Sequence, residues 1–223
     1  MTRRSFCHVA LTAGALGALG GLSGCVAKNS RTERATARGK GATVSIDSST
    51  WRYDEKDDVY YQLGVAYCAS PQAAAYECMN IYVPGAYFQA KKTRGDSYTC
   101  TPSDAAAISG FTASTAPIVV SINATDYNAF AAPDTYRHAD AYTFVKAGFV
   151  CVIPSFRGAN MDGSAAACAP WAVTDLKAAV RTLRANAAVL AGDLDRIFSC
   201  GAGVGGGLSA LLGSSGRSKE YTR

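Results

Sequence analysis

Residues 201–205 read Gly-Ala-Gly-Val-Gly, which is the spacing of a motif that usually carries a nucleophile. In Gly-x-Ser-x-Gly, a serine stands at the apex of a sharp turn between a strand and a helix, where its hydroxyl attacks an acyl carbon. The apex position here is Gly203, which has no side chain. The spacing therefore predicts an elbow-shaped turn with Gly201 and Gly205 at its ends, and the residue at the apex predicts that this turn carries no nucleophile.

The same glycines also fit Gly-x-Gly-x-x-Gly through Gly201, Gly203 and Gly206. That motif binds the pyrophosphate of a dinucleotide and needs a second strand with an acidic residue about 20 positions further on. Only 17 residues follow Gly206, and Ser, Gly and charged residues dominate them. A nicotinamide or flavin site at residues 201–206 stays an alternative, as does a glycine turn with a structural role alone.

Apolar runs on either side of the turn predict the elements that position it. Residues 197–200 form a short apolar strand before it, and Leu208, Leu211 and Leu212 fall on one face of a helix after it. Upstream, we expect buried strands at 117–122 and 149–154 and helices at 133–146 and 170–190. This alternation is typical of an α/β fold with a mostly parallel sheet and right-handed crossovers.

The preceding part of the chain has a different pattern. Aromatic and β-branched residues predict strands at 42–46, 59–67 and 79–83, whereas residues 85–116 are predicted to be rich in loops. About 180 residues of folded material correspond to one domain. We therefore expect a single partial α/β domain over residues 41–223.

The first 40 residues carry targeting signals. Arg3 and Arg4 precede an apolar run rich in Ala, Gly and Leu, which resembles a twin-arginine signal peptide over residues 1–24. The residues before Cys25 resemble a lipobox, so Cys25 is the expected lipidation site and residues 25–40 a disordered tether. These features predict export and anchoring in the cell membrane on its outer face.

Charge and cysteine content exclude two classes of site. Residues 41–223 hold 15 Lys and Arg against 16 Asp and Glu, so the folded part lacks the basic surface that nucleic acid requires. Six cysteines remain outside the signal peptide and the lipid site, and they allow 15 disulfide pairings among which the sequence does not choose. Cys151 and Cys200 lie in apolar runs and are equally compatible with buried free thiols. No Cys-x-x-Cys spacing occurs and His138 is the only histidine outside the signal peptide, so we expect no metal. We also expect no cofactor.

Four segments resemble a known family. They are YQLGVAYC at 61–68, MNIYVP at 79–84, AVTDLKAAVRTLRAN at 172–186 and LSALLG at 208–213. Together they are similar to exported bacterial carboxylesterases of the α/β-hydrolase superfamily, near the subtype B tannases, over residues 59–223. The resemblance implies cleavage of a carboxylic ester, such as a phenolic ester, by serine acyl transfer.

Carried onto this sequence, the resemblance assigns the nucleophile position to Gly203. It assigns the oxyanion-binding N–H groups to Val204 and to the turn at Asn123 and Ala124. No histidine follows His138, which we expect to face solvent, and Ser209 lies too far along the helix to replace the nucleophile.

Asp175 is expected to be a helix-surface acid. The sequence also continues for only one helix after the elbow, without the further strands, lid and triad residues of the family. We therefore expect an ester-hydrolase chain that is inactive as written, either a truncated relic or one piece of a split enzyme that a second fragment would complete. An open sheet edge would favour self-association. The alternative is a lipid-anchored protein that binds phenolic esters without cleaving them.

Overall fold

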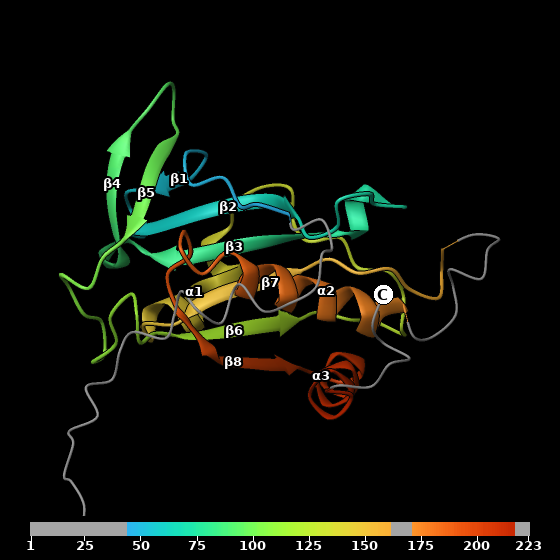
Figure 1. Cartoon of the computed structure of the whole chain (residues 1–223). Helices are drawn as coiled ribbons and strands as arrows, with labels where there is room; N and C mark the ends of the chain where they lie inside the picture. Colours follow the sequence, from blue (N-terminus) through green and yellow to red (C-terminus); the bar gives the residue numbers. More distant parts are fainter. Residues whose placement is uncertain (1–43, 162–170, 217–223) are drawn as a thin grey trace, which may run out of the picture.

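The computed structural model describes residues 44–161 and 171–216. Within them, a six-stranded sheet has the order β1-β2-β3-β7-β6-β8, and a separate two-stranded sheet is formed by β4 and β5 (Figure 1). The predicted signal peptide, Cys25 and the tether lie outside the described residues. In the described part of the chain, no helix is long and apolar enough to cross a membrane.

The carboxyl-terminal half of the sheet is parallel, as predicted. β6 (Pro117–Ile122) pairs in parallel with β7 (Val150–Pro154) on one side and with β8 (Asp193–Gly201) on the other. The connecting helices are shorter than expected: α1 spans His138–Lys146 and α2 spans Trp171–Ala185. α3 (Val204–Ser214) follows β8 directly.

The amino-terminal half of the sheet is antiparallel. β1 (Arg52–Asp54) pairs with β2 (Val59–Ala66), β2 pairs with β3 (Cys78–Pro84), and β3 joins β7 at the middle of the sheet. The predicted strands at 59–67 and 79–83 are therefore present, whereas no strand forms at 44–46, the described part of the run predicted at 42–46. The sheet as a whole is mixed.

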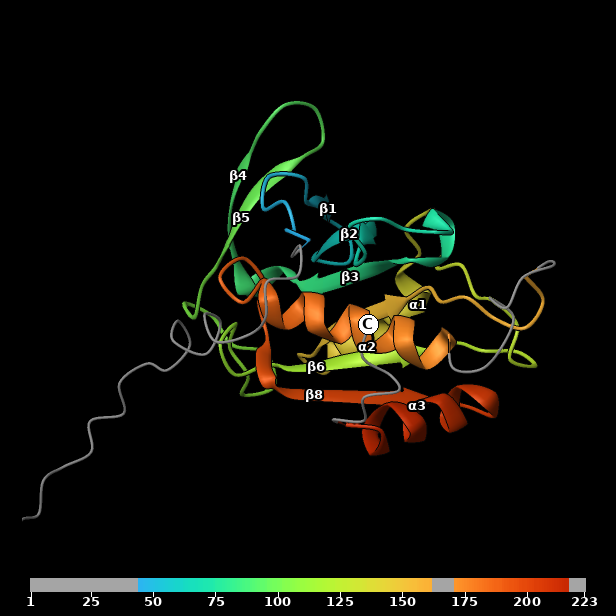
Figure 2. The same cartoon turned by 45° about the vertical axis from the view of Figure 1, so that its right-hand side comes forward.

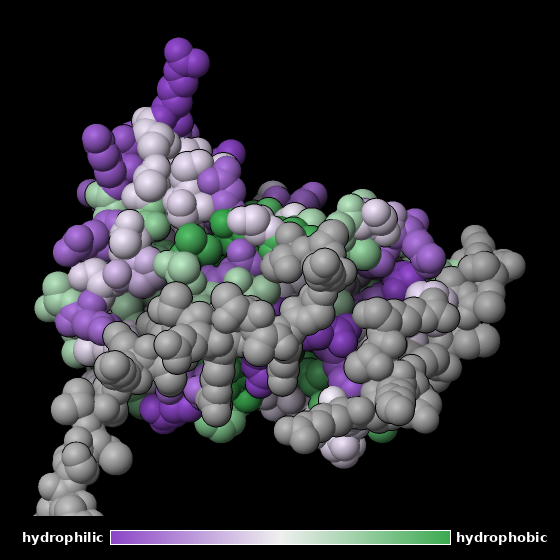
Figure 3. Space-filling model, in the orientation of Figure 1, coloured by the Kyte–Doolittle hydropathy of each residue, from purple (hydrophilic) through white to green (hydrophobic). Residues whose placement is uncertain are grey.

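Residues 85–116, predicted to be rich in loops, contain a β-hairpin of β4 (Phe88–Lys92) and β5 (Tyr98–Pro102). The hairpin projects from the body of the molecule at the upper left of Figure 1, and its tip is hydrophilic in Figure 3. Its base is apolar, because the ring of Phe88 packs 4.9 Å from the buried ring of Trp51. This packing fixes the hairpin on the domain.

Helices cover both faces of the main sheet (Figures 1 and 2). α2 and α3 lie on one face, where Leu176, Leu183 and Leu208 are buried in the larger hydrophobic core. α1 covers the other face over β3 and β7 with Ala141 and Val145. Of the three leucines predicted to face the sheet from α3, Leu208 and Leu212 do so, whereas Leu211 is 43 % exposed.

The five described cysteines are Cys68, Cys78, Cys100, Cys151 and Cys200, and all are unpaired. Burial raises the pKa of the Cys100 thiol to about 12. Cys151 is fully buried in β7, which agrees with a buried thiol, and Cys200 is partly buried. Cys168 lies outside the described residues.

Candidate functional site

The turn after β8 has the predicted elbow shape. β8 ends at Gly201 and α3 begins at Val204, with Gly203 between them at φ 53° and ψ −121°. L-residues with a side chain rarely adopt a positive φ of this size, and such strained positions are concentrated at functional sites. A β-carbon placed on Gly203 would meet no atom within 4 Å. The apex is therefore open, and the missing side chain is not a steric requirement.

The two flanking glycines allow the elbow to lie against β6. A β-carbon on Gly205 would lie 2.3 Å from the carbonyl oxygen of Ile122, and one on Gly201 would lie 2.5 Å from the carbonyl carbon of Gly205. Both distances are shorter than the contact distance of two non-bonded heavy atoms, so these positions require glycine. The close approach also brings the turn after β6 to the elbow, because the amide nitrogen of Ala124 lies 3.7 Å from the same position on Gly205.

Two backbone N–H groups at this junction have no hydrogen-bond partner among residues 44–161 and 171–216. Val204 is the first residue of α3, where helical N–H groups have no partner within the helix. The N–H of Ala124 makes no hydrogen bond within the described part of the chain. The positive end of the α3 dipole points at the same place. The first turn of α3 and the turn after β6 therefore bring backbone donors to the same junction.

The turn after β6 is held by the loop after β7. Phe130 and Phe156 exchange two backbone hydrogen bonds of 2.9 Å each, and the N–H of Ala129 donates to Oδ1 of Asn160 at 2.7 Å. Gly158 packs so closely on the chain at Ala129 that a β-carbon there would lie 2.1 Å from the Ala129 nitrogen. The two loops therefore form one unit beside the elbow.

A buried ion pair anchors that unit to α2. Arg157 donates from Nε to Oδ2 of Asp175 at 2.9 Å and from Nη2 to Oδ1 at 2.6 Å, and its guanidinium lies 3.9 Å from the ring centroid of Trp171. Burial opposes the charge on Arg157, but the hydrogen bonds and the charge of Asp175 raise the pKa of Arg157 overall. Both side chains are more than nine-tenths buried. The expectation that Asp175 is a surface acid is wrong.

A cavity of about 410 Å³ adjoins the turn after β6. It lies between the ends of β6 and β7 and the first turn of α1, and Asn123 is part of its wall. Its lining residues are Ser121, Asn123, Phe130, Pro133, Arg137, Ala139, Asp140 and Ile153. Local sequence patterns do not predict this cavity, because its walls come from β6, β7, α1 and the segment between β6 and α1.

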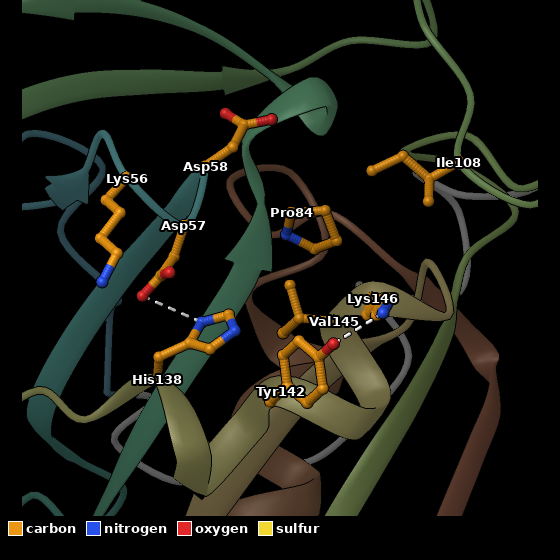
Figure 4. A pocket seen from close by; sticks show the side chains of 9 residues that line it. All are labelled: Lys56, Asp57, Asp58, Pro84, Ile108, His138, Tyr142, Val145 and Lys146. Atoms are coloured by element: carbon orange, nitrogen blue, oxygen red, sulfur yellow. Dashed lines mark hydrogen bonds and ion pairs between the residues drawn. The ribbon is translucent and has the colours of Figure 1, made fainter.

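A second hollow, of about 330 Å³, lies on the opposite side of α1, between that helix and the β1–β2 turn (Figure 4). His138 faces it, with Nδ1 3.1 Å from Oδ2 of Asp57. Pro84 at the end of β3 also lines it, and β3 runs antiparallel to β7, so this hollow lies away from the strand ends that carry the elbow. The expectation that His138 faces solvent is only partly correct, because its side chain is 31 % exposed and Nδ1 contacts Asp57.

Ser209 lies within α3 and is hydrogen-bonded through Oγ to Oγ of Ser199 at 2.8 Å. It is therefore not at the elbow apex, in agreement with the sequence interpretation. Among the described residues, no cluster of His, Cys, Asp and Glu side chains has the arrangement of a metal site.

Comparison with family models gives a match to BD-FAE, an α/β-hydrolase-type esterase domain, over residues 109–222. The matched region runs from the segment before β6 to beyond α3, so it contains the elbow, the turn after β6 and the cavity. No curated protein matches the chain.

Solved structures of tannases are similar to most of this chain. Fusobacterium nucleatum tannase is 27 % identical with a TM-score of 0.66, covering 80 % of this chain and 37 % of that one. Tannase from Lactobacillus plantarum is 29 % identical with a TM-score of 0.59, covering 73 % and 33 %. A tannin acyl hydrolase in complex with ethyl gallate is 26 % identical with a TM-score of 0.59, covering 73 % and 34 %. The chain thus spans about a third of the length of the tannases that it matches.

Proposed function

Because the chain belongs to the BD-FAE family of α/β-hydrolase-type esterase domains, we propose that it binds a small phenolic ester at the elbow without cleaving it. The observation that carries the proposal is the backbone of Gly203, which has a positive φ at the apex of the turn and open space above it. The N–H groups of Val204 and Ala124 are proposed to bind the carbonyl oxygen of the ester, and no hydroxyl stands on the apex. The ester is proposed to be phenolic because matched hydrolases were solved with ethyl gallate and with 3,4-dihydroxybenzoate.

The expected loss of turnover is large. In a serine hydrolase, removal of the nucleophile lowers turnover by roughly 10⁶-fold, and the remaining rate comes from carbonyl binding and substrate orientation. Binding through backbone N–H groups does not depend on the apex side chain. A chain with Gly203 therefore keeps the interactions that hold an ester and lacks the group that attacks it.

Calorimetric titration of the purified chain with methyl gallate, followed by chromatography of the mixture, tests both parts of the proposal. We expect saturable binding and no gallic acid. A fluorophosphonate probe, which labels activated serines, should leave no adduct. Release of gallic acid or a phosphonylated serine would show that the chain is an active esterase.

A pair of variants locates the binding. Gly203→Asp places a carboxylate where the carbonyl oxygen of the ester is proposed to lie, so methyl gallate should bind at least about tenfold more weakly. Gly95→Asp is the matched control, because Gly95 also has a positive φ and free space around it but lies at the turn between β4 and β5. Equal affinity of the two variants would place the ligand elsewhere.

We also propose that Cys25 is acylated and holds the exported domain at the outer face of the cell membrane. More than one acyl chain gives stable anchoring, since each buried CH₂ contributes about 0.8 kcal/mol. The full chain should partition into the detergent phase of a membrane extract, and Cys25→Ser should move it to the aqueous phase. Cys7→Ser, within the predicted signal peptide, should not change the partition of the mature protein.

A further inference from the structure

The cavity beside the turn after β6 combines flat apolar walls with polar groups. Ile153 on β7 is buried, and Phe130 packs against the same cluster of side chains. Around them stand Ser121, Asn123 and the ion pair of Arg137 with Asp140. A ligand for such a cavity has an apolar face and hydrogen-bonding substituents at its edge.

The walls are fixed before any ligand arrives. The N–H of Ala132 donates to Oγ of Ser155 at 2.9 Å, and Nδ2 of Asn80 donates to the carbonyl of Pro133 at 2.7 Å. Both partners are buried: Asn80 lies in β3, and Ser155 directly follows β7. A segment held in this way loses little conformational freedom on binding, which favours affinity.

The polar groups still have capacity for hydrogen bonds. Nη2 of Arg137 lies 3.1 Å from Oδ1 of Asp140, and Nε of Arg137 donates a hydrogen bond to Oδ2 at 3.2 Å. An ionised carboxylate accepts about four hydrogen bonds, so each oxygen of Asp140 can accept one more. Within the described part of the chain, the hydroxyl of Ser121 and the amide of Asn123 make no hydrogen bond.

From this arrangement we propose that the cavity holds the hydroxylated aromatic ring of the ester and that Asp140 accepts hydrogen bonds from the ring hydroxyls. The assignment rests on the proposed function and adds to it the part of the ligand that is recognised. An alkyl acyl chain fits less well, because it would cover Asp140 and Arg137 without replacing their hydrogen bonds to water. Asn123 belongs both to the cavity wall and to the turn beside the elbow, so one ligand can reach both.

Calorimetry with two ligands tests the assignment on the full chain. Methyl gallate has ring hydroxyls, and methyl benzoate has the same ring and ester without them. Asp140→Asn should lower the affinity for methyl gallate by at least about tenfold, because a hydrogen bond to a charged acceptor is lost. The affinity for methyl benzoate should change by less than about twofold. Asp134→Asn is the matched control, since Asp134 is exposed just before α1 and does not line the cavity.

A second pair of variants tests occupancy without changing a charge. Ala139 is exposed on α1 and lines the cavity. Ala139→Trp therefore fills the cavity and should lower the affinity for methyl gallate by at least about tenfold. Thr143→Trp, exposed on the same helix but lining neither hollow, should leave affinity within about twofold. If methyl gallate binds as tightly to Asp140→Asn and to Ala139→Trp as to the native chain, the ring assignment is wrong and the proposed function stands. If the native chain binds neither ligand, both proposals fail.

Discussion

At the residue scale, glycine is favoured at two positions of the elbow for different physical reasons. Gly203 has free space around it but a positive φ that would strain a residue with a β-carbon, whereas a side chain on Gly205 would collide with the backbone oxygen of Ile122. Conformational strain and steric overlap have different free-energy costs, and only the overlap forces β6 and α3 apart.

Gly203→Ser should lower the free energy of unfolding by about 1–2 kcal/mol, the cost of holding an L-residue at a positive φ. Gly205→Ser should lower it by about 3 kcal/mol or more, because β6 and α3 must separate. Both substitutions restrict the unfolded chain equally, so the difference between them reports the native state. Urea denaturation measures it, and equal losses would contradict the described packing of the elbow.

The Arg157–Asp175 pair gives a second prediction at this scale. Asp175→Asn leaves the buried guanidinium of Arg157 with Glu77, 3.7 Å from Nη2, as its one remaining counter-charge among the described residues, which should cost about 3 kcal/mol of stability. Asp134→Asn, at an exposed position, should change stability by less than about 0.5 kcal/mol. Urea midpoints of the two variants provide the measurement. A loss below about 1 kcal/mol for Asp175→Asn would mean that the pair does not anchor the loops beside the elbow.

Single residues also show where sequence reasoning failed. The sequence predicts Asp175 on the helix surface, but its partner Arg157 lies 18 positions earlier in the segment after β7. His138 was partly misjudged in the same way, since Asp57 reaches it from a turn far away in the sequence. Local periodicity does not contain either contact. The spacing of Gly201, Gly203 and Gly205, in contrast, specifies a local turn, and that turn is present.

At the element scale, the buried strands were predictable because their sequences are apolar on both faces. β6 has the predicted bounds, and β7 begins one residue later than predicted. The β4–β5 hairpin was missed because Lys91, Lys92 and Thr99 interrupt any apolar pattern in its strands. Its stability comes from backbone pairing and from aromatic packing at its base, neither of which leaves a local signature.

The antiparallel half of the sheet should lose stability in alkaline solution. Burial raises the pKa of Tyr60, Tyr82 and Tyr87 from 10.0 to about 12 in each case. A raised pKa means that the folded state keeps these protons while the unfolded state releases them. Their stabilisation is complete below pH 10 and is lost as the pH rises from about 10 to about 12, at up to about 1.4 kcal/mol per pH unit for each tyrosine.

Urea denaturation at several pH values between 8 and 12 checks this slope. The hydroxyl of Tyr60 makes no hydrogen bond to any described residue, so Tyr60→Phe removes a titrating group and no such bond. The free energy of unfolding should therefore fall less steeply with pH in the variant, by the contribution of one tyrosine. A slope that is the same in native chain and variant would show that Tyr60 does not contribute to the alkaline loss.

At the scale of the whole molecule, β8 forms an edge of the main sheet within the described residues (Figure 2). Its first half is irregular, since Pro117 and Ile118 of β6 pair with Asp193 and Ile197, and bulges of this kind protect an edge from further pairing. Its second half is regular and carries Phe198, whose side chain is 55 % exposed. The helix on the other face of the sheet, α1, packs on β3 and β7. Leu211 on α3 is a second exposed apolar side chain near β8.

A regular edge strand with an exposed aromatic ring favours pairing with another chain. We therefore expect the native chain to self-associate in a concentration-dependent way, and Phe198→Lys to oppose it, because a lysine on an edge strand adds charge where two copies would meet. Tyr127→Lys is the matched control: Tyr127 is 54 % exposed but lies in the turn after β6. Sedimentation velocity over a range of concentrations distinguishes the two variants. If the native chain sediments as a monomer throughout, the edge of β8 does not mediate association; if both variants dissociate equally, net charge and not the edge controls it.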